Sequence, residues 1–434
     1  MYKMEKIMTL SRSDMSFIYS LKRIFMGSDT QLSINLMQLK FFLVVAEFQN
    51  ISKAAEHLFR TQSAITRAIS DLEKQLQIEL FERHHNGVIL TDIGSSLLIQ
   101  VKNAIEELRQ IPLIVQKYKN LDSEQSQPIN EPFFLYNTRR LEIFSTLYLT
   151  KGMKNTASLL NITQPAVSSA IKLLEESLNI ELFIRTPNGI RATEVCELLQ
   201  QNIKRCLNII NDLPNQIANF IGNMQGTVRI GALPLIRTFL LPKAIAALAN
   251  QYPRIRFLTF ESAYESLVAQ LRSGDIDFIV GAIRPQEQSS DLYSQILFDE
   301  NMFMVVRNKH PLLRKKIQLP DLLDQQWILP RTNSPARILL ENNFKSLNLI
   351  PPEPTVETGD LALSRGLLLE SNMIAVVSEQ QMKYELDQGL IKKLPFDLPQ
   401  TTRQIGLIFR KNSIQSSVTK ALIQSLENIC KEIV

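Results

Sequence analysis

Two stretches of this 434-residue chain carry polar side chains of the kinds that contact nucleic acid. Each stretch predicts a helix whose outward face offers short hydroxyls, an amide and cationic groups. Such groups can hydrogen-bond to base edges in a major groove and to phosphates. The candidate contacts of the first stretch are Gln62, Ser63, Thr66, Arg67 and Arg83. Those of the second stretch are Gln164, Pro165, Ser168, Ser169 and Arg185.

The two stretches belong to an internal repeat. Residues 39–91 align without gaps with residues 141–193, at an offset of 102, and 20 of the 53 positions are identical. The identities gather in the second half of the unit, where Ile-Glu-Leu-Phe at 78–81 recurs at 180–183. A duplicated unit predicts that one small domain is built twice.

Each copy predicts a short helix, a tight connection, a longer helix and a hairpin. In the first copy apolar residues at helical spacing begin at Leu39, Asn50 or Ser52 can cap the second helix, and Gln62 opens the third. Asn-Gly between apolar runs, at 86–87 and 188–189, predicts the hairpin turns. This order describes a winged helix. The alternative is a three-helix protein-interaction module, but two tandem copies with a wing each favour DNA.

From residue 226 onward strands alternate with helices, which indicates a parallel α/β sheet. Strands are predicted at 227–231, 256–260, 278–281 and 302–306, after which we expect the chain to cross into a second lobe. That lobe is predicted to hold strands at 327–329, 355–357 and 374–377, and the chain returns at 405–409. Two lobes joined by crossing strands form a cleft that can close on a ligand.

Composition narrows the function classes. The chain has 3 cysteines, 4 histidines and a formal net charge of +5 without a basic tail. Neither residue type has metal-ligand spacing, and no phosphate loop or Gly-x-Ser-x-Gly motif is present. We therefore expect no catalytic residues, no metal and no cofactor. No apolar run is long enough to span a membrane, so we expect a cytoplasmic protein with no membrane partner.

The motifs carry a family resemblance. AAEHLFRTQSAITRAISDLEKQLQIELFERHHNGVILTDIG resembles the DNA-binding domain of LysR-type bacterial transcriptional regulators, and TQPAVSSAIKLLEESLNIELFIRTPNGIRAT resembles it again. By resemblance, the third-helix candidates match positions that contact bases and phosphates. The duplication departs from the family, and Ser169 stands where the family often has Arg. A linker helix that pairs two subunits is implied after each copy, at 92–121 and 194–221, interrupted by Pro112 and Pro214.

The C-terminal region resembles the family's effector-binding domain, which shares its fold with periplasmic binding proteins. The resemblance implies a small organic effector, with an organic or aromatic acid as the expected class, and Arg237 or Arg331 as counter-charge. The implied effector-binding residues are Leu233, Pro234, Leu235, Ile236, Ser262, Ala263, Gly281, Pro330, Arg331, Thr332, Gly359 and Asp360.

The expected fold class is an α/β multidomain protein: two tandem winged helix-turn-helix domains with linker helices, then a two-lobed effector domain. The expected boundaries are an extension at 1–34, winged helices at 35–94 and 133–193, linkers at 95–132 and 194–223, and an effector domain at 224–434. Its lobe one spans 224–304 and 402–434, and lobe two spans 305–401. Expected partners are double-stranded DNA, the effector, further copies in a homodimer or homotetramer, and RNA polymerase if the protein activates.

Three alternatives remain at this point. In the first, only one repeat contacts DNA and the other serves dimerisation or partner docking. In the second, the chain is a ligand-binding protein of periplasmic type that binds no DNA. In the third, the cleft is the active site of an enzyme. The repeat argues against the second, and the missing catalytic motifs argue against the third.

Overall fold

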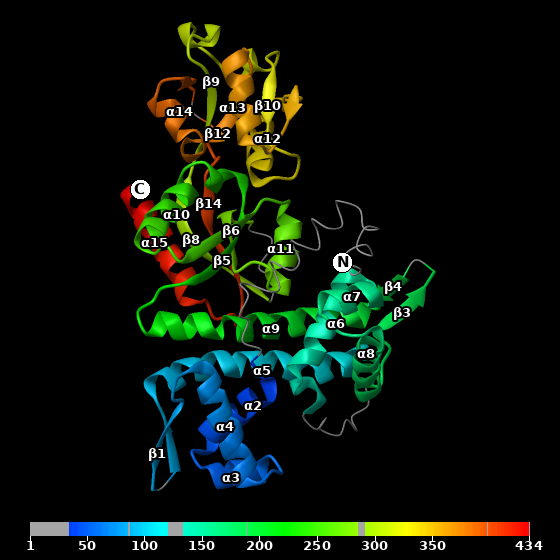
Figure 1. Cartoon of the computed structure of the whole chain (residues 1–434). Helices are drawn as coiled ribbons and strands as arrows, with labels where there is room; N and C mark the ends of the chain where they lie inside the picture. The colour runs from blue at the N-terminus through cyan, green and yellow to red at the C-terminus, as the bar shows by residue number, and fades with distance from the viewer. Residues whose placement is uncertain are drawn as a thin grey trace, which may run out of the picture. The chain divides into compact units, whose positions relative to one another are not determined.

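The structure is a computed structural model that describes residues 34–85, 87–119, 133–187, 189–284, 291–396 and 398–433. It divides into two compact units, Met1–Gly222 and Asn223–Val434 (Figure 1). Of the predicted extension at 1–34, only Ile34 is described, and it is buried in the first unit. Both Asn residues of the predicted Asn-Gly turns lie outside the described residues.

The first unit contains the two predicted winged helices. The first comprises α2 (Leu36–Phe48), α3 (Ile51–His57), α4 (Gln62–Leu76), β1 (Phe81–His84) and β2 (Gly87–Leu90). The second comprises α6 (Thr138–Thr150), α7 (Met153–Leu159), α8 (Gln164–Leu178), β3 (Phe183–Thr186) and β4 (Gly189–Ala192), after the short 3-10 helix η2 (Phe133–Tyr136). Every element begins 102 residues after its counterpart, so the repeat in sequence is a repeat in structure.

Local signals explain where these elements start and turn. The Asn50 side chain accepts hydrogen bonds from the backbone N–H groups at the start of α3, and Thr61 caps α4. Gly87 has φ 147° and lies against the backbone carbonyl of Gln49, which accepts a 3.0 Å hydrogen bond from the N–H of Val88. A side chain at Gly87 would block this approach, so glycine lets the wing pack on the end of α2.

Each winged helix leads into a 27-residue helix, α5 (Asp92–Tyr118) and α9 (Glu194–Phe220). The prediction that Pro112 and Pro214 interrupt these helices is wrong, because both helices continue past the proline. α5 and α9 lie side by side (Figure 1). Their buried apolar faces belong to one hydrophobic core that joins both winged helices. This packing outweighs the hydrogen bond that each proline removes.

Lobe one of the second unit has a five-stranded sheet in the order β6-β5-β7-β14-β8. Its strands are β5 (Gly226–Ala232), β6 (Ile255–Phe260), β7 (Phe278–Ala282), β8 (Leu292–Glu300) and β14 (Arg403–Arg410). Its helices are η3 (Pro234–Arg237), α10 (Leu240–Gln251), α11 (Tyr264–Ser273) and α15 (Ser417–Ile433). The sheet is mixed rather than parallel as predicted, because β14 is antiparallel to β7 and β8.

Lobe two has a second five-stranded sheet, in the order β11-β10-β12-β9-β13. Its strands are β9 (Met302–Arg307), β10 (Trp327–Leu329), β11 (Val356–Glu357), β12 (Ile374–Ser378) and β13 (Ile391–Lys393). Its helices are η4 (Pro311–Arg314), η5 (Leu319–Leu322), α12 (Pro335–Ser346), α13 (Leu361–Glu370), η6 (Glu379–Gln381) and α14 (Lys383–Asp387). Since β9 pairs with β12 and β13, the chain crosses between lobes before this strand, earlier than the predicted 304/305 boundary.

The two crossing segments lie side by side. The Thr402 hydroxyl lies 2.6 Å from the amide oxygen of Asn301, and the side chains of Glu300 and Arg403 form a buried ion pair at 3.5 Å. Burial raises the pKa of Glu300 even though Arg403 opposes the shift. The described residues hold no helix long and apolar enough to cross a lipid bilayer.

Candidate nucleic-acid interface

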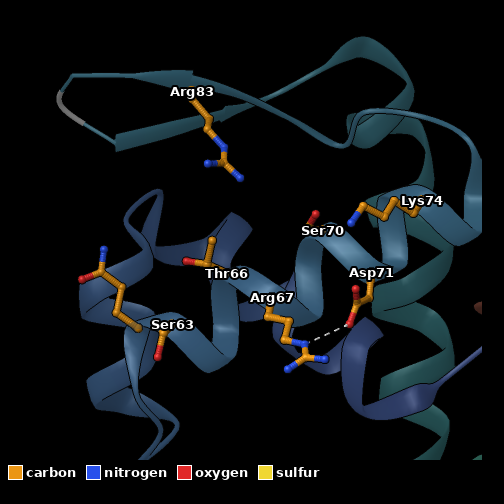
Figure 2. Close-up of a pocket in the computed structure, with 8 residues that line it drawn as sticks. Ser63, Thr66, Arg67, Ser70, Asp71, Lys74 and Arg83 are labelled. Carbon is orange, nitrogen blue, oxygen red and sulfur yellow. Dashed lines mark ion pairs between the residues drawn. The ribbon is translucent and has the colours of Figure 1, made fainter.

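An open groove of about 710 Å³ runs between α4 and the wing strand β1. It is lined by Gln62, Ser63, Thr66, Arg67, Ser70, Asp71, Lys74 and Arg83. Figure 2 shows the side chains of α4 along the groove and Arg83 extending toward them from the wing. All five candidate contacts of the first repeat therefore come together, on two elements that the core holds in place.

The sequence of α4 explains why these side chains are available. Ile65, Ile69, Leu72 and Leu76 bury one face of the helix in the core, which turns the polar positions outward. Arg67 and Asp71 approach to only 3.9 Å, and the Arg67 side chain is 87% exposed. An ion pair this exposed contributes little, so Arg67 can leave Asp71 for a phosphate or a base. The groove thus offers cations and hydroxyls, a combination suited to duplex DNA.

The second repeat builds the same face on α8. Gln164, Pro165 and Ser169 are exposed, Ser168 is half-buried, and Arg185 projects from β3. Proline occupies the first turn of α8, where its missing N–H has no helical partner to lose. The five candidate contacts of this repeat are again on one recognition helix and its wing.

The two faces differ in charge. Lys74 of the first face is replaced at the equivalent position by Glu176, which pairs with Lys172 at 3.6 Å. Asp71 is replaced by Leu173, whose side chain is 47% exposed. The first face therefore has three cations and one acid, and the second has two cations, one acid and an apolar group.

A glutamate in each copy holds the wing to the recognition helix, a role that the sequence analysis missed. The Glu73 carboxylate accepts hydrogen bonds from the backbone N–H groups of Leu80 and Phe81, at 2.8 and 3.3 Å. Glu175 does the same for Leu182 and Phe183, at 2.8 and 3.1 Å. Identity of this glutamate between the copies was the available signal. By holding the first strand of each wing, these carboxylates fix the position of the backbone that carries Arg83 and Arg185.

The second unit brings some of the predicted effector residues together. A Cβ placed on Gly359, after β11, would lie 3.8 Å from the ring of Pro234 in η3 and 4.0 Å from Nε of Arg331. Pro234 belongs to lobe one, and Arg331 and Gly359 belong to lobe two, so three of the residues that the resemblance implied lie close to one another across the lobes. Arg331 is exposed there, and Pro330 precedes it at the end of β10. Ser262 and Ala263 are exposed at the start of α11.

Other predicted effector residues have structural roles. The side chains of Leu235 and Ile236 are buried in the hydrophobic core of lobe one. Leu233 packs on Gly281, whose φ of 152° and close contact exclude a side chain. The Thr332 hydroxyl donates to Glu357 at 2.8 Å, and this bond lowers the pKa of Glu357. Asp360 caps α13 and occupies its N-terminus.

The three cysteines are buried thiols. Burial raises the pKa of Cys430 to about 11, and it raises those of Cys196 and Cys206 still further. A thiol with such a pKa is a poor nucleophile and metal ligand at neutral pH. Among the described residues, no three His, Cys, Asp or Glu side chains gather as a metal site would require.

The fold and the groove define a class of protein: a regulator with winged-helix DNA-binding domains and a two-lobed ligand-binding domain. The family model for the "Bacterial regulatory helix-turn-helix protein, lysR family" matches residues 36–95 and again 138–197. The model for the "LysR substrate binding domain" matches residues 222–431. The chain belongs to the LysR family of transcriptional regulators, and it carries two copies of the family's DNA-binding domain.

Among its relatives is the HTH-type transcriptional regulator GalR of Pseudomonas putida, 40% identical over 398 residues, which cover 92% of this chain and 98% of GalR. The HTH-type transcriptional regulator PcaQ of Agrobacterium fabrum is 26% identical, over 68% of this chain and 95% of PcaQ. Among solved structures, a full-length OxyR variant from Pseudomonas aeruginosa has a TM-score of 0.50 at 21% identity and covers 68% of this chain and 98% of its own. GalR and PcaQ are transcriptional regulators, and the OxyR structure shares the fold.

Proposed function

We propose that both winged helices of this LysR regulator contact DNA, within one operator. The observation that carries the proposal is the repetition of the exposed recognition face, with an arginine on the wing, in both copies. A copy kept only for docking would not need Gln164, Ser168 and Arg185 on the same backbone framework. The residues that hold the framework, such as Glu175, are also retained.

The alternative, in which the second copy only docks a partner, has one observation in its favour. Ser169 replaces Arg67, and Glu176 replaces Lys74, so the second face offers fewer cations to phosphates. We expect it to bind DNA with a different base preference and a weaker salt dependence.

Single substitutions on each face test the proposal. Arg67→Ala should weaken operator binding by about tenfold or more, because a base or phosphate contact of an arginine contributes roughly 1–3 kcal/mol. Gln164→Ala combined with Ser169→Ala should weaken it by several-fold. The measurement is fluorescence anisotropy and DNase footprinting on DNA that flanks the gene. Lys420→Ala, an exposed lysine of α15 in the other unit, is the matched control for loss of a charged side chain.

Footprinting separates the outcomes. If both faces bind, each substituted face should lose one block of protection, with blocks spaced by helical turns of about 10–10.5 base pairs. Full protection by the Gln164→Ala/Ser169→Ala protein would make the second copy an accessory module. If the Arg67→Ala protein and the Gln164→Ala/Ser169→Ala protein both gave the full footprint, the proposal would be contradicted for both copies.

We further propose that the effector is a small organic anion, bound between Pro234, Arg331 and Gly359. The exposed Arg331 guanidinium is the group there that favours an acid. Effector binding would change how chains associate, and through that the contact with promoter DNA and RNA polymerase in the cytoplasm. No cofactor other than this effector is proposed.

A further inference from the structure

The long helices α5 and α9 cover each other's apolar faces within one chain. α5 buries Val101, Ile105 and Leu108, and α9 buries Ile203, Leu207 and Ile210, all in one core. The two helices are antiparallel (Figure 1), and the ammonium group of Lys119, just after α5, donates a 3.1 Å hydrogen bond to the carbonyl of Leu178 at the end of α8. The C-terminal end of α5 therefore reaches the second winged helix.

The two winged helices meet at a residue and its own repeat counterpart. Thr138 is the repeat counterpart of Leu36, and its hydroxyl oxygen accepts a 3.0 Å hydrogen bond from the N–H of Leu36. The same hydroxyl donates to the carbonyl of Ile34 at 2.9 Å. At a twofold axis, residues contact their own counterparts and equivalent helices that cross the axis run antiparallel, as Leu36 with Thr138 and α5 with α9 do here. The first unit therefore has the arrangement of a symmetric dimer, made by a single polypeptide.

One polar cluster breaks this symmetry. Arg205 of α9 binds Glu107 of α5 through two hydrogen-bonded contacts, Nη2 to Oε2 at 2.7 Å and Nε to Oε1 at 2.8 Å. Asn202 also donates to Glu107 Oε2, at 3.0 Å. The side chains of Glu107 and Arg205 are each only 13% exposed. Removing one member of such a largely desolvated ion pair leaves an uncompensated charge, which strongly destabilises the fold.

The symmetry-related positions cannot make this cluster. The counterpart of Glu107 is Ile209, and the counterpart of Arg205 is Asn103. If α5 paired with α5 of a second chain in the same register, Glu107 would face Asn103. If α9 paired with α9, Arg205 would face Ile209. Both self-pairings leave a charge without its partner, so the cluster favours α5 on α9.

We propose that one chain contains a complete pair of DNA-binding domains. In this pair, Glu107 and Arg205 favour packing of α5 on α9 of the same chain over packing of these helices between chains. Because the two recognition helices are related by an approximate twofold axis, their half-sites are inverted relative to each other. Because the recognition faces differ at Arg67 and Ser169, the half-sites differ in sequence. The expected partner is therefore an imperfect inverted repeat that a single chain occupies. The DNA part of this inference rests on the proposed function, but the helix pairing does not.

Charge reversal tests the pairing in the full-length chain. Glu107→Arg alone places two arginines together, and Arg205→Glu alone places two glutamates together. Each should lower the midpoint of thermal unfolding of the first unit by roughly 6 °C or more and weaken operator binding about tenfold or more. The double variant Glu107→Arg/Arg205→Glu restores opposite charges. It should recover most of the lost unfolding temperature and most of the lost operator affinity. Glu106→Arg, an exposed neighbour on α5, is the matched control.

An equimolar mixture of the two single variants, unfolded together and refolded, decides between one chain and two. If α5 pairs with α9 of another chain, the mixture supplies opposite charges at every interface and recovers like the double variant. If the pairing is within one chain, the mixture stays as defective as its components. Recovery of the mixture would overturn the proposal. So would single variants that match the control, because they would indicate self-pairing of α5 and of α9.

Thermal unfolding needs no DNA, so it tests the helix pairing even if the proposed operator binding fails. Stoichiometry then tests the DNA part. A duplex with one inverted pair of half-sites should bind one chain, measured by native mass spectrometry at low protein concentration. Two chains on each such duplex, with one winged helix of each engaged, would contradict it.

Discussion

Arg67 and Ser169 stand at the same position on two copies of one recognition helix, and only the first carries a charge. Differences at this scale could be predicted from the sequence, because a gapless repeat fixes which residues correspond. Burial in the second unit could not be predicted in the same way. Leu235 and Ile236 were assigned to the cleft by resemblance, but a 3-10 turn directs both side chains into the core.

Arg331 provides a test of the cleft at the level of one residue. Benzoate, as a probe of aromatic carboxylates, is expected to raise the unfolding temperature of the second unit, because a ligand at about 100 times its Kd stabilises by roughly 2.7 kcal/mol. Arg331→Ala should weaken benzoate binding about tenfold or more, since a charge-assisted hydrogen bond is lost. Thermal unfolding with and without benzoate measures the stabilisation. Calorimetric titration of the unaltered protein and of the Arg331→Ala protein measures the affinity.

Benzamide, which is neutral and has nearly the same shape, is the ligand control for that experiment. Arg237→Ala is the protein control, because Arg237 is the other candidate counter-charge. Equal stabilisation by benzoate and benzamide would exclude an anion site at Arg331.

At the scale of elements, each wing depends on one glutamate of the recognition helix. Glu73→Ala removes the acceptor of two backbone N–H groups, so it should lower the free energy of unfolding by roughly 1–3 kcal/mol. Hydrogen exchange at the amides of Leu80 and Phe81 should become faster, and DNA affinity should fall because Arg83 is no longer positioned. Glu73→Gln, which keeps one acceptor oxygen, should have a smaller effect.

Glu79 is a matched control for Glu73, because it is also identical in the two copies but is exposed. If Glu79→Ala and Glu73→Ala behaved alike, the carboxylate of Glu73 would not be what anchors the wing.

Most elements followed from local patterns, and the errors had tertiary causes. Apolar spacing, caps and the repeat predicted both winged helices, and β10 begins and ends where predicted. Pro112 and Pro214 were interpreted as interruptions because propensity alone opposes proline in a helix, whereas the partner helix stabilises both segments. Strands β8 and β13 were not predicted, and the crossing point depends on which sheet β9 joins.

At the scale of the whole molecule, the pairing of α5 with α9 decides what a truncation would do. A chain that starts at residue 133 keeps α9 but lacks α5, which uncovers the apolar side chains of Ile203, Leu207 and Ile210. We expect such a chain to self-associate as its concentration rises, while the intact chain keeps α9 covered. Sedimentation velocity over a hundredfold range of concentration measures this.

Two results would contradict that expectation. One is a truncated chain whose sedimentation coefficient does not change with concentration. The other is a truncated chain that unfolds at the same temperature as the intact protein. Either would mean that α9 is stable without α5, and that the core joining the winged helices contributes little.

The packing of Thr138 against Leu36 and Ile34 has a consequence for how the protein can evolve. In a regulator made of two identical chains, one substitution in a recognition helix alters both half-sites at once, so the operator must change in two places together. Here the two recognition helices are encoded separately, although they are held as a pair. On the proposed function, a mutation in α8 leaves α4 unchanged, so each half of an operator can change in sequence and be matched by its own helix. The duplication therefore removes the requirement that the two half-sites of the promoter have the same sequence, so each half-site can change together with its own recognition helix.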